Sequence, residues 1–296
     1  MLDNPVWHTL VGPRRALAQR HGQAARFDPD VSVFAAVVDD PDPAAWDDLA
    51  ALVGSGQPAA MLRRTVVPPQ GWVIEEGGSG VQMVATPAVT TTPGDGPAVE
   101  SLGPADADEM SRLIALEPPG PWLPRTVELG GYVGVRDGGR LVAMAGERMR
   151  CGGFTEISAV CTHPDHRGRG LATLLTRVIV ARIRARGEEA FLHTAGSNDV
   201  AIRLYERLGF RVRTSIEYGL LRPVIDATAP APPPGPRRTG HPGSTTTSPP
   251  PARTSGSACG QHALSSAPLR GGWVSCRSNP HGRTACTYAS GPNVHR

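Results

Sequence analysis

Hydrophobic residues recur at helical spacing in two stretches of the second half of the chain. Over residues 171–183 they follow an i, i+3, i+4, i+7 pattern, which predicts an amphipathic helix; the positions are Leu171, Leu174, Leu175, Val178, Ile179 and Ile183. A second helix is predicted over "SNDVAIRLYERL", residues 197–208, where Ser197 or Asn198 stands close to the N-cap position.

Alternating and β-rich segments surround these helices. "YVGVR" and "LVAMAGERM", joined by the turn "DGGR", predict a β-hairpin over residues 132–149. Residues 154–163 predict a strand in which Glu156 shares a face with every second residue up to Thr162, because side chains alternate along a strand. Further strands are predicted at residues 190–195, "AFLHTA", and 209–223, "GFRVRTSIEYGLLRP".

The first third of the chain has shorter elements and no chemical motif. Segments such as "VSVFAAVVDD" and "AAWDDLAALVG" read as short strands and helices between Pro and Gly turns, so residues 1–95 predict a small α/β domain. A break at "TPAVTTTPGDGPAV", residues 86–99, ends it. A helix from about Pro104 to Ala115 then opens the second domain, residues 100–225, with acidic residues suited to its N-terminus.

The C-terminal residues 226–296 differ in composition from the rest of the chain. The chain of 296 residues carries 30 basic and 27 acidic residues, but residues 226–296 hold seven Arg and one acid, a net charge of +6. The total of +3 therefore leaves −3 on residues 1–225. The Pro-, Ser- and Gly-rich residues 226–296 have little hydrophobic material to bury and predict a disordered tail. With no long apolar run, we expect a cytoplasmic protein without a membrane partner.

The tail could also be interpreted as a zinc site or as a nucleic-acid-binding arm. Both interpretations have less support than an extension without a defined role. Its Cys and His residues lack paired CxxC spacing for zinc; they are Cys259, His262, Cys276, His281 and Cys286. Its arginines are scattered and almost without aromatic neighbours, so a nucleic-acid arm is not favoured. With Cys151 and Cys161 the chain has five cysteines, an odd number that does not indicate a disulfide framework.

The stretch "HPDHRGRG", residues 163–170, joins a predicted strand to a predicted helix. A helix N-terminus presents free N–H groups and a partial positive charge, which favours a phosphate. Gly168 and Gly170 allow a close approach of the backbone, and Arg167 and Arg169 add bidentate donors. Neither the Lys-Ser/Thr of a P-loop nor GxGxxG is present, so an Arg-x-x-Gly-x-Ala turn for a phosphate remains.

This turn, following "AVCTHPDH" and followed by "N...AIRLYERLGF", resembles the coenzyme A site of the GNAT family of N-acetyltransferases. The resemblance covers about residues 100–225 and implies an α/β fold with a mixed, mostly antiparallel sheet flanked by helices. It also implies acetyl-CoA as cosubstrate, no metal, and a small-molecule or peptide amine as acceptor. Residues 1–95 resemble the N-terminal part of some longer members. The oligomeric state stays open.

The resemblance also implies roles for single residues. The strand before the turn would splay from its neighbour and pair with the pantetheine arm through the main chain of Val160, Cys161 and Thr162. The turn amides would bind the pyrophosphate; they belong to Arg167, Gly168, Arg169, Gly170, Leu171, Ala172 and Thr173. Asn198 would contact the cofactor, Tyr205 would protonate the departing thiolate, and Glu156 matches the general base of some members.

The free-energy costs of the two proton transfers show which of the two acid–base roles matters more. Presenting an alkylamine of pKa about 10.4 in neutral form at pH 7 costs about 4.6 kcal/mol, whereas a thiol of pKa about 8.5 has a deficit of about 2 kcal/mol. Glu156 as base therefore matters more than Tyr205 as acid. The alternatives are a solvated Glu156 and a core Tyr205, since Tyr205 shares an apolar helical face with Leu208. Cys161 as an acyl-carrying nucleophile lacks an evident base.

Residues 117–131, "EPPGPWLPRTVELGG", stand where acceptor-binding elements are expected. Glu117 is suited to an amine, Trp122 to an apolar body and Arg125 to a carboxylate. The identity of the acceptor does not follow from the sequence. A catalytically silent acyl-CoA-binding module that senses or regulates is the alternative to an enzyme, and the presence of both Glu156 and Tyr205 favours the enzyme.

Overall fold

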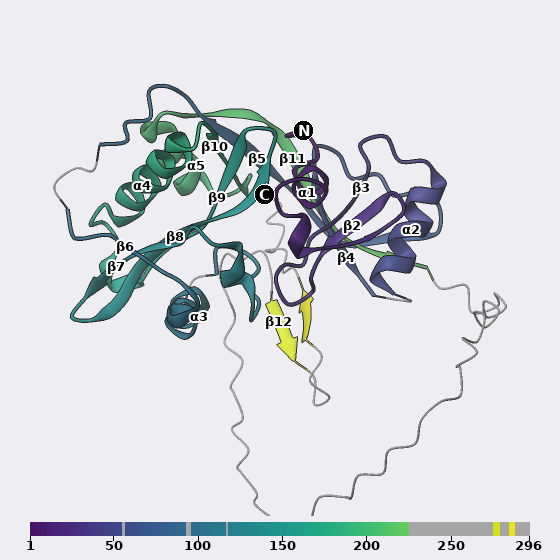
Figure 1. Cartoon of the computed structure of the whole chain (residues 1–296), viewed down its shortest axis with the longest axis horizontal. Coiled ribbons are helices and arrows are strands. Elements are labelled where there is room, and N and C mark those ends of the chain that lie inside the picture. Colours follow the sequence, from purple (N-terminus) through teal and green to yellow (C-terminus); the bar gives the residue numbers. More distant parts are fainter. Residues whose placement is uncertain (55–56, 93–95, 117, 225–274, 279–283, 288–296) are drawn as a thin grey trace, which may run out of the picture. The chain divides into compact units, whose positions relative to one another are not determined.

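The computed structural model describes residues 1–54, 57–92, 96–116, 118–224, 275–278 and 284–287 (Figure 1). Residues 1–225 belong to one compact unit. None of the helices in the described ranges combines the length and the apolar character that a membrane span requires.

An eight-stranded sheet organises this unit. The eight strands form seven neighbouring pairs. The pair β10–β9 is parallel and the other six are antiparallel, so the predicted mixed, mostly antiparallel sheet is confirmed. In the order of the sheet the strands are β4 (Ala59–Arg63), β11 (Phe210–Pro223), β5 (Trp72–Ala85), β10 (Glu189–Ala195), β9 (Phe154–Thr162), β8 (Arg140–Cys151), β7 (Val133–Asp137) and β6 (Glu100–Ser101).

The predicted hairpin is the pair β7–β8. Asp137 pairs with Arg140, and the two residues between them, Gly138 and Gly139, have φ of 57° and 81°. Two consecutive residues with positive φ form the type I′ turn that matches the twist of the flanking strands, and glycine adopts this conformation without strain.

Three helices flank the second half of the sheet (Figure 1). α4 (Leu171–Ala185) and α5 (Asp199–Leu208) confirm the two helical patterns, and the Asn198 side chain caps α5 by accepting a hydrogen bond from the Ala201 N–H at 3.0 Å. α3 (Ala107–Leu116) follows a 3₁₀ turn at Pro104–Asp106. Neighbouring residues of β8 serve opposite faces of the sheet: Val142 packs with α4, and Leu141 with α3.

The first third of the chain forms a second, smaller sheet with two helices. Its strands are β1 (Ala18–His21), β2 (Ala24–Phe27) and β3 (Ala35–Val37), in that order, and its helices are α1 (Pro5–Leu10) and α2 (Pro43–Val53). α2 begins with Asp42 as N-cap, whose carboxylate accepts from the Ala45 N–H, and Pro43 follows in the first turn. The short strands and helices expected here are present.

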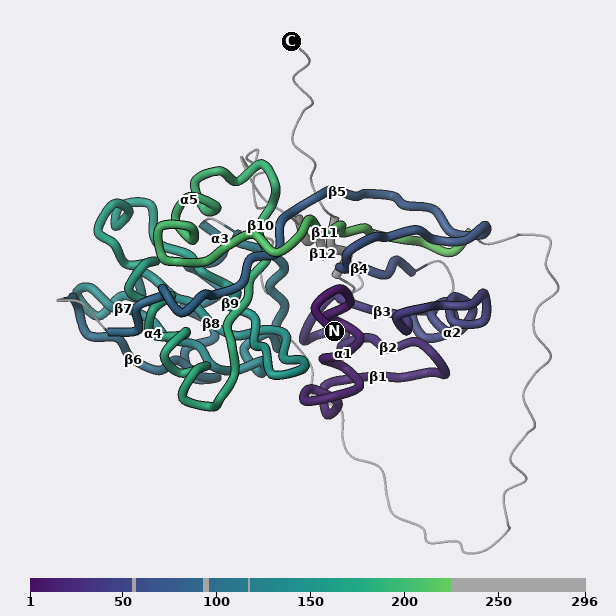
Figure 2. Tube along the Cα trace, turned by 90° about the horizontal axis from the view of Figure 1, so that it is seen from above, coloured from purple at the N-terminus to yellow at the C-terminus, as the bar shows by residue number. Residues whose placement is uncertain are grey.

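The expected division at residues 95–100 does not coincide with a break in the sheet. β4 and β5 come from the first third of the chain, yet β5 lies between β11 and β10 in the large sheet, and Figure 2 shows it running alongside β11. Its sequence reads as two short segments because Gly77, Gly78 and Gly80 interrupt the hydrophobic pattern. In the structure β5 is nevertheless one continuous strand, because the residues at these glycines pair with β11.

Hydrophobic packing joins the same two parts of the chain. Phe27 of β2 and Phe191 of β10 are both fully buried and belong to one cluster, together with Met149 of β8. The helices α4 and α5 cover a separate cluster on the large sheet, built around Leu175, Ile179 and Tyr205. The first third of the chain therefore covers part of the sheet that carries the predicted site.

Within residues 226–296 the structure describes one antiparallel pair, β12 (Ser275–Ser278) and β13 (Thr284–Thr287). The sequence predicted no regular element there. The other residues of the segment lie outside the described ranges, as do most of the positions considered for zinc.

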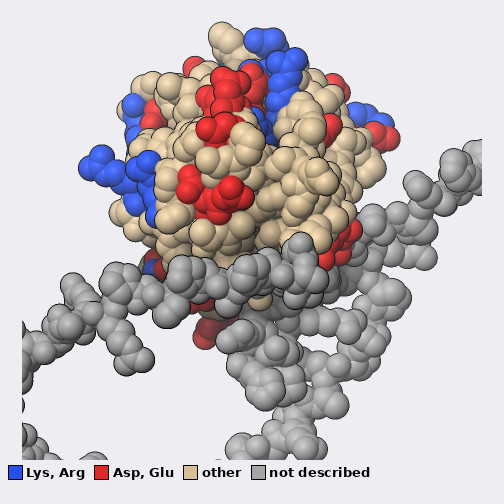
Figure 3. Space-filling view, turned by 90° about the vertical axis from the view of Figure 1, so that its right-hand side faces the viewer, with Lys and Arg blue, Asp and Glu red and all other residues tan. Residues whose placement is uncertain are grey.

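Acidic and basic side chains are mixed on the described surface. Figure 3 shows both kinds on the face at the right-hand side of Figure 1, separated by neutral residues and without an extended basic stripe. This agrees with the nearly balanced charge of residues 1–225.

Candidate functional site

The turn between β9 and α4 has the conformation that its glycines allow. Gly168 has φ of 75°, and Gly170, the N-cap of α4, has φ of 76°. A Cβ on either residue would meet no atom within 4 Å, so the backbone angle and not the available space calls for glycine. No side chain caps α4. The first-turn amides of a 15-residue helix are thus presented for an anion.

The carboxylate of Asp137 contacts two side chains of this turn, those of Arg169 and His166. Asp137, in the β7–β8 turn, accepts from Arg169 Nη1 at 3.0 Å and lies 3.2 Å from His166 Nε2. The hydrogen bond and charge of Arg169 lower the pKa of Asp137. Arg167 and Arg169 are exposed. His163 and His166 contact each other edge to face, with ring centres 5.4 Å apart.

The strands β9 and β10 separate before the turn, as the family resemblance implied. Their parallel pairing runs from Phe154 with Glu189 to Ile157 with Leu192, although β9 continues to Thr162 and β10 to Ala195. Beyond Leu192, β10 pairs with β5 on its other side. The main chain of Val160, Cys161 and Thr162 therefore lies on a strand edge that β10 does not cover.

A bulge marks the point of separation. Ala159 has φ of 53°, and the β8–β9 register shifts between the pairs Gly146–Ser158 and Met144–Cys161. The extra residue changes the face on which later side chains lie. Val160 packs with the α4 cluster that contains Ile157, while Ala159 and Cys161 pack with α3. The sequence predicted that every second residue from Glu156 to Thr162 shares one face, and the bulge shows that this prediction is wrong beyond Ser158.

The residues expected on α5 lie next to this gap. Tyr205 is 8% exposed, packs edge to face on Phe210, and shares a cluster with Leu171 and Val160. Burial raises the pKa of its hydroxyl to about 12, so the phenol is protonated at neutral pH. The amide oxygen of Asn198 is used as the cap of α5. Both the core role and a cofactor-side role of Tyr205 fit this position.

Glu156 occupies a buried, fully partnered position. Its side chain is 0% exposed, and Arg148 donates to both carboxylate oxygens, from Nε at 2.8 Å and from Nη2 at 2.6 Å. His193 Nδ1 lies 2.7 Å from one oxygen, and the Met149 N–H donates to the other at 3.3 Å. Burial opposes the charge, but the charge and hydrogen bonds of Arg148 outweigh it and lower the pKa to about 2.

These contacts do not fit the expected role of Glu156 as general base. A base needs a pKa close to the working pH and an oxygen within reach of the amine. The Glu156 carboxylate has neither, because its pKa is low and its oxygens are taken by Arg148 and His193. The solvated alternative does not fit either. Glu156 is a buried carboxylate that orients other groups.

The polar network continues from Glu156 to the start of the chain. Gln82 of β5 donates to the Leu2 carbonyl at 2.8 Å and accepts from Arg213 at 2.8 Å, which fixes the orientation of its amide. The amide nitrogen then lies 2.9 Å from His193 Nε2. His193 must therefore accept there and carry its proton on Nδ1, toward Glu156.

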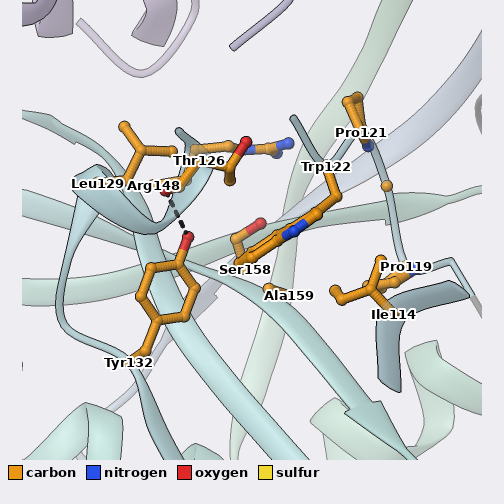
Figure 4. Close-up of a pocket in the computed structure, with 11 residues that line it drawn as sticks. Ile114, Pro119, Pro121, Trp122, Thr126, Leu129, Tyr132, Arg148, Ser158 and Ala159 are labelled. Carbon is orange, nitrogen blue, oxygen red and sulfur yellow. Dashed lines mark hydrogen bonds between the residues drawn. The ribbon is translucent and has the colours of Figure 1, made fainter. Parts of the chain in front are cut away.

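A recess lies beside the strand separation and brings α3, the following loop, β8 and β9 together (Figure 4). It is lined by Ile114, Pro119, Gly120, Pro121, Trp122, Thr126, Leu129, Tyr132, Arg148, Ser158 and Ala159. The rings of Trp122 and Tyr132 meet edge to face, with centres 5.6 Å apart. Tyr132 donates to the Thr126 carbonyl.

The three residues expected at the acceptor end have different positions. Trp122 lines the recess, and its indole N–H donates to Ser111 at 2.9 Å. Arg125 does not line it: its guanidinium pairs with Glu128 at 2.6 Å and with Asp28 at 2.8 Å. The carboxylate-binding role expected of Arg125 therefore does not fit. Glu117 lies outside the described residues.

Cys161 is also unsuited to a nucleophilic role. Its side chain is buried, and burial raises the pKa of the thiol to about 12, so the reactive thiolate is not formed at neutral pH. Cys151 is buried too, and both are free thiols.

Sequence reasoning missed Arg148 and His193. Both are polar residues within otherwise hydrophobic strands, "LVAMAGERMRC" and "AFLHTA", and this was the available signal, since a charged residue is seldom buried without a partner. Ser158, on the same strand as Glu156, also belongs to the site because it lines the recess.

A splayed strand pair, a glycine turn that opens a helix, and a recess at the point of separation define the class of protein. This is the arrangement expected for a GNAT-type acyl-CoA site. The comparisons with known proteins bear on the same class.

A family model described as FR47-like protein matches residues 132–218. N-alpha-acetyltransferase RimI of Mycobacterium tuberculosis is 35% identical over 124 residues, 38% of this chain and 77% of that protein. The structure of a putative GNAT acetyltransferase from Novosphingobium aromaticivorans has 42% identity and a TM-score of 0.67, and covers 75% of this chain and 98% of that one. The chain belongs to the GNAT family of N-acetyltransferases.

Other relatives match over less of their length. Mycothiol acetyltransferase of Rhodococcus jostii is 42% identical over 65 residues, and the match spans 21% of either chain. The chain thus covers about a fifth of the mycothiol acetyltransferases that it resembles, the one from Thermobispora bispora included.

Proposed function

We propose that this protein transfers the acetyl group of acetyl-CoA to a primary amine by direct attack in a ternary complex. One observation carries the proposal: the recess and the strand gap meet at Ser158 and Ala159, which line the recess at the point where β9 leaves β10. An amine in the recess and a thioester along the edge of β9 would meet there. The name of the relative RimI, an N-alpha-acetyltransferase, supports an amine as acceptor.

The described residues fit acetyl-CoA. The uncovered edge of β9 at Val160, Cys161 and Thr162 offers main-chain groups to the pantetheine arm. The uncapped start of α4 and the two positive-φ glycines offer amides to the pyrophosphate, as expected for residues 167–173. Acetyl-CoA supplies the acyl group as an activated thioester. Contacts of Asn198 with it stay a prediction.

In the proposed reaction the amine nitrogen bonds to the acetyl carbon, and the carbon–sulfur bond breaks. The amine loses a proton and the sulfur gains one, so the step balances without a further reactant. Tyr205 is the proposed donor of the proton to sulfur, because its hydroxyl is protonated and its ring shares a cluster with Val160 on β9. Because its pKa is raised, the phenol is a weak acid; if it only donates a hydrogen bond to the departing thiolate, the sulfur takes its proton from water.

The pH dependence follows from what surrounds the acceptor. Among the described residues of the recess there is no carboxylate and no imidazole. We therefore propose that the acceptor binds as the neutral amine, so kcat/KM is expected to rise tenfold per pH unit until the pH approaches the pKa of the acceptor. Initial rates from pH 6 to pH 9 with subsaturating amine measure this slope.

A plateau that begins below pH 7 would contradict this expectation, since it would require a base within the protein. The same profile for Glu117→Gln then decides the role of Glu117, which follows α3 and precedes the recess residue Pro119. Loss of the plateau in that variant would identify Glu117 as the base.

The lack of a base among the described recess residues also favours the second candidate, a silent acyl-CoA-binding module. Calorimetric titration of acetyl-CoA into the full chain, followed by a panel of amines with thiol release monitored, separates the two. Binding with amine-dependent thiol release supports the transferase. Binding without release for any amine supports the module, and no binding contradicts both.

The variant Gly170→Ala tests the turn in the same titration. An L-residue at φ of 76° costs about 1–2 kcal/mol, so relaxation of the turn is expected to weaken acetyl-CoA binding by about tenfold. Gly153→Ala is the matched control, because Gly153 has φ of 80° in open space at the opposite end of β9. Equal effects of the two substitutions would contradict a role of the turn in binding.

A further inference from the structure

We propose that the connection between β2 and β3, residues 28–34, belongs to the acceptor side of the site, where it positions the loop of residues 118–131. The proposal rests on the proposed transferase function and gives the first third of the chain a role in acceptor binding. The loop follows α3 and forms much of the recess wall (Figure 4). Its lining residues are residues 119–122, Thr126 and Leu129.

The β2–β3 connection is fixed by hydrogen bonds of its own. The Asp28 carbonyl accepts from the Val31 N–H at 2.9 Å, and the Asp28 carboxylate accepts from the Asp30 N–H at 3.0 Å. A carboxylate that binds the main chain two residues further on forms an Asx-turn. The Phe34 carbonyl accepts from the Phe27 N–H at 3.0 Å and closes the connection at the end of β2. Residues 28–34 are thus a preformed support for a neighbouring loop.

In the described part of the chain, three hydrogen bonds join this connection to the loop. Arg125 Nη1 donates to the Asp28 carboxylate at 2.8 Å, and the Arg125 main-chain N–H donates to the Asp30 carbonyl at 2.9 Å. The Thr126 hydroxyl donates to the Val31 carbonyl at 2.8 Å. Thr126 is 5% exposed, so its bond is the buried anchor of the loop. Arg125 has its place here, as a tether to Asp28.

The anchored residues reach the recess directly. Thr126 lines it, and its hydroxyl also accepts from the Leu123 N–H at 2.8 Å, next to the recess residue Trp122. Leu129 lines the recess too, is 1% exposed, and belongs to the same hydrophobic cluster as Val31. The position of residues 28–34 therefore sets the position of this wall.

The size of the recess makes the position of the wall important for an acceptor. The recess has a volume of about 10 Å³, room for about one water molecule. An amine therefore enters only when part of the lining moves. Pro119 is exposed, whereas Thr126 and Leu129 are buried against the β2–β3 connection. We expect residues 119–122 to move and the anchored half to stay, which limits the loop entropy lost when the acceptor binds.

The test removes the buried anchor in the full chain. Thr126→Val keeps the shape of the side chain but leaves the Val31 carbonyl and the Leu123 N–H without the hydroxyl. We expect faster hydrogen exchange in peptides from residues 118–131 and an acceptor KM that is about tenfold higher, since an unpaired buried group is costly. The Kd of acetyl-CoA, measured by calorimetry, should stay the same. KM is measured by thiol release for the fastest of benzylamine, L-phenylalaninamide, spermidine and the peptide Ala-Gly-Ala amide.

Thr9→Val is the matched control. Thr9 is fully buried, and its hydroxyl accepts from the Arg150 N–H at 3.1 Å, so it also joins the first third of the chain to the large sheet. This bond leads to β8 and not to the loop. Thr9→Val should therefore leave both the acceptor KM and the exchange of residues 118–131 unchanged.

Asp28→Asn is a milder second variant, which keeps the test valid if Thr126→Val does not fold. The amide oxygen can still accept from the Asp30 N–H, while the charge that faces Arg125 is lost. This ion pair is partly exposed and contributes little, so a rise of about threefold in the acceptor KM is expected. Asp3→Asn is its control, because Asp3 pairs with Arg213 at the same distance of 2.8 Å, away from the loop.

The outcomes separate this proposal from the proposed function. An acceptor KM that changes equally in the variants and their controls, or in none of them, overturns the positioning role. A lower KM in Thr126→Val overturns it as well, since the anchor would then oppose acceptor binding. Faster exchange of the loop with an unchanged KM overturns the link to the acceptor and leaves the transferase function intact. If acetyl-CoA binds and no amine releases thiol, the transferase function fails, and this inference fails with it.

Discussion

Replacing Glu156 by alanine is expected to lower the free energy of unfolding by about 3 to 5 kcal/mol. The substitution leaves the Arg148 guanidinium and the Nδ1–H of His193 in a buried region without the carboxylate that accepts from both. Breaking one side of a buried ion pair costs more than the pair itself contributes, because the remaining charge has lost both water and its partner. Urea unfolding of the full chain at pH 7 measures the change.

Glu189→Ala is the matched control. Glu189 is 51% exposed, and its distance of 3.4 Å to Arg184 describes a surface ion pair, which contributes less than about 1 kcal/mol. A similar loss in both variants would contradict the special position of Glu156.

The same carboxylate sets an acid limit to stability. Its pKa is lowered from 4.5 to about 2 in the folded protein. The stabilisation, about 3 kcal/mol, is therefore complete above about pH 4.5 and is lost as the pH falls to about 2. In Glu156→Gln the stability between these values should depend less on pH. If the loss of stability between about pH 4.5 and pH 2 is the same in Glu156→Gln as in the wild-type protein, Glu156 is not its cause.

The second large effect is expected at Phe27. Phe27→Ala removes a fully buried ring from the cluster that also holds Phe191 and Met149 of the large sheet, and should cost about 3 to 5 kcal/mol. Because this cluster joins both parts of residues 1–225, we expect α2 and α4 to lose hydrogen-exchange protection together. Exchange measured on peptides from residues 43–53 and 171–185 tests this.

Val200→Ala, at a side chain that is 74% exposed, is the control and should change stability by less than about 0.5 kcal/mol. Loss of protection in α2 alone, with α4 unchanged, would mean that residues 1–95 unfold as the separate domain that the sequence predicted.

The parts of the site that depend on local sequence were predictable. The stripe from Leu171 to Ile183 fixes α4, and two glycines before it require positive φ, so the anion-binding turn follows from neighbouring residues. Helix α5 and its Asn198 cap are equally local.

The surroundings of Glu156 were not predictable in this way. Its partners come from β8 and β10, and the next member of the network, Gln82, from β5. Which strands become neighbours is decided by burial over the whole sheet, and a single sequence does not state it. The bulge at Ala159 adds a second reason, since one extra residue changes the face of all later side chains.

The place of β5 in the middle of the sheet has a consequence for synthesis on the ribosome. β5 ends at Ala85, but both of its neighbours, β10 and β11, are made much later. Both edges of β5 are unpaired until β10 has left the exit tunnel, and one edge stays unpaired until β11 has followed it. Long-range pairing of this kind slows folding and exposes strand edges to aggregation. Fragments that end before β11 are therefore expected to be poorly soluble, and a shorter version of this protein has to keep β11.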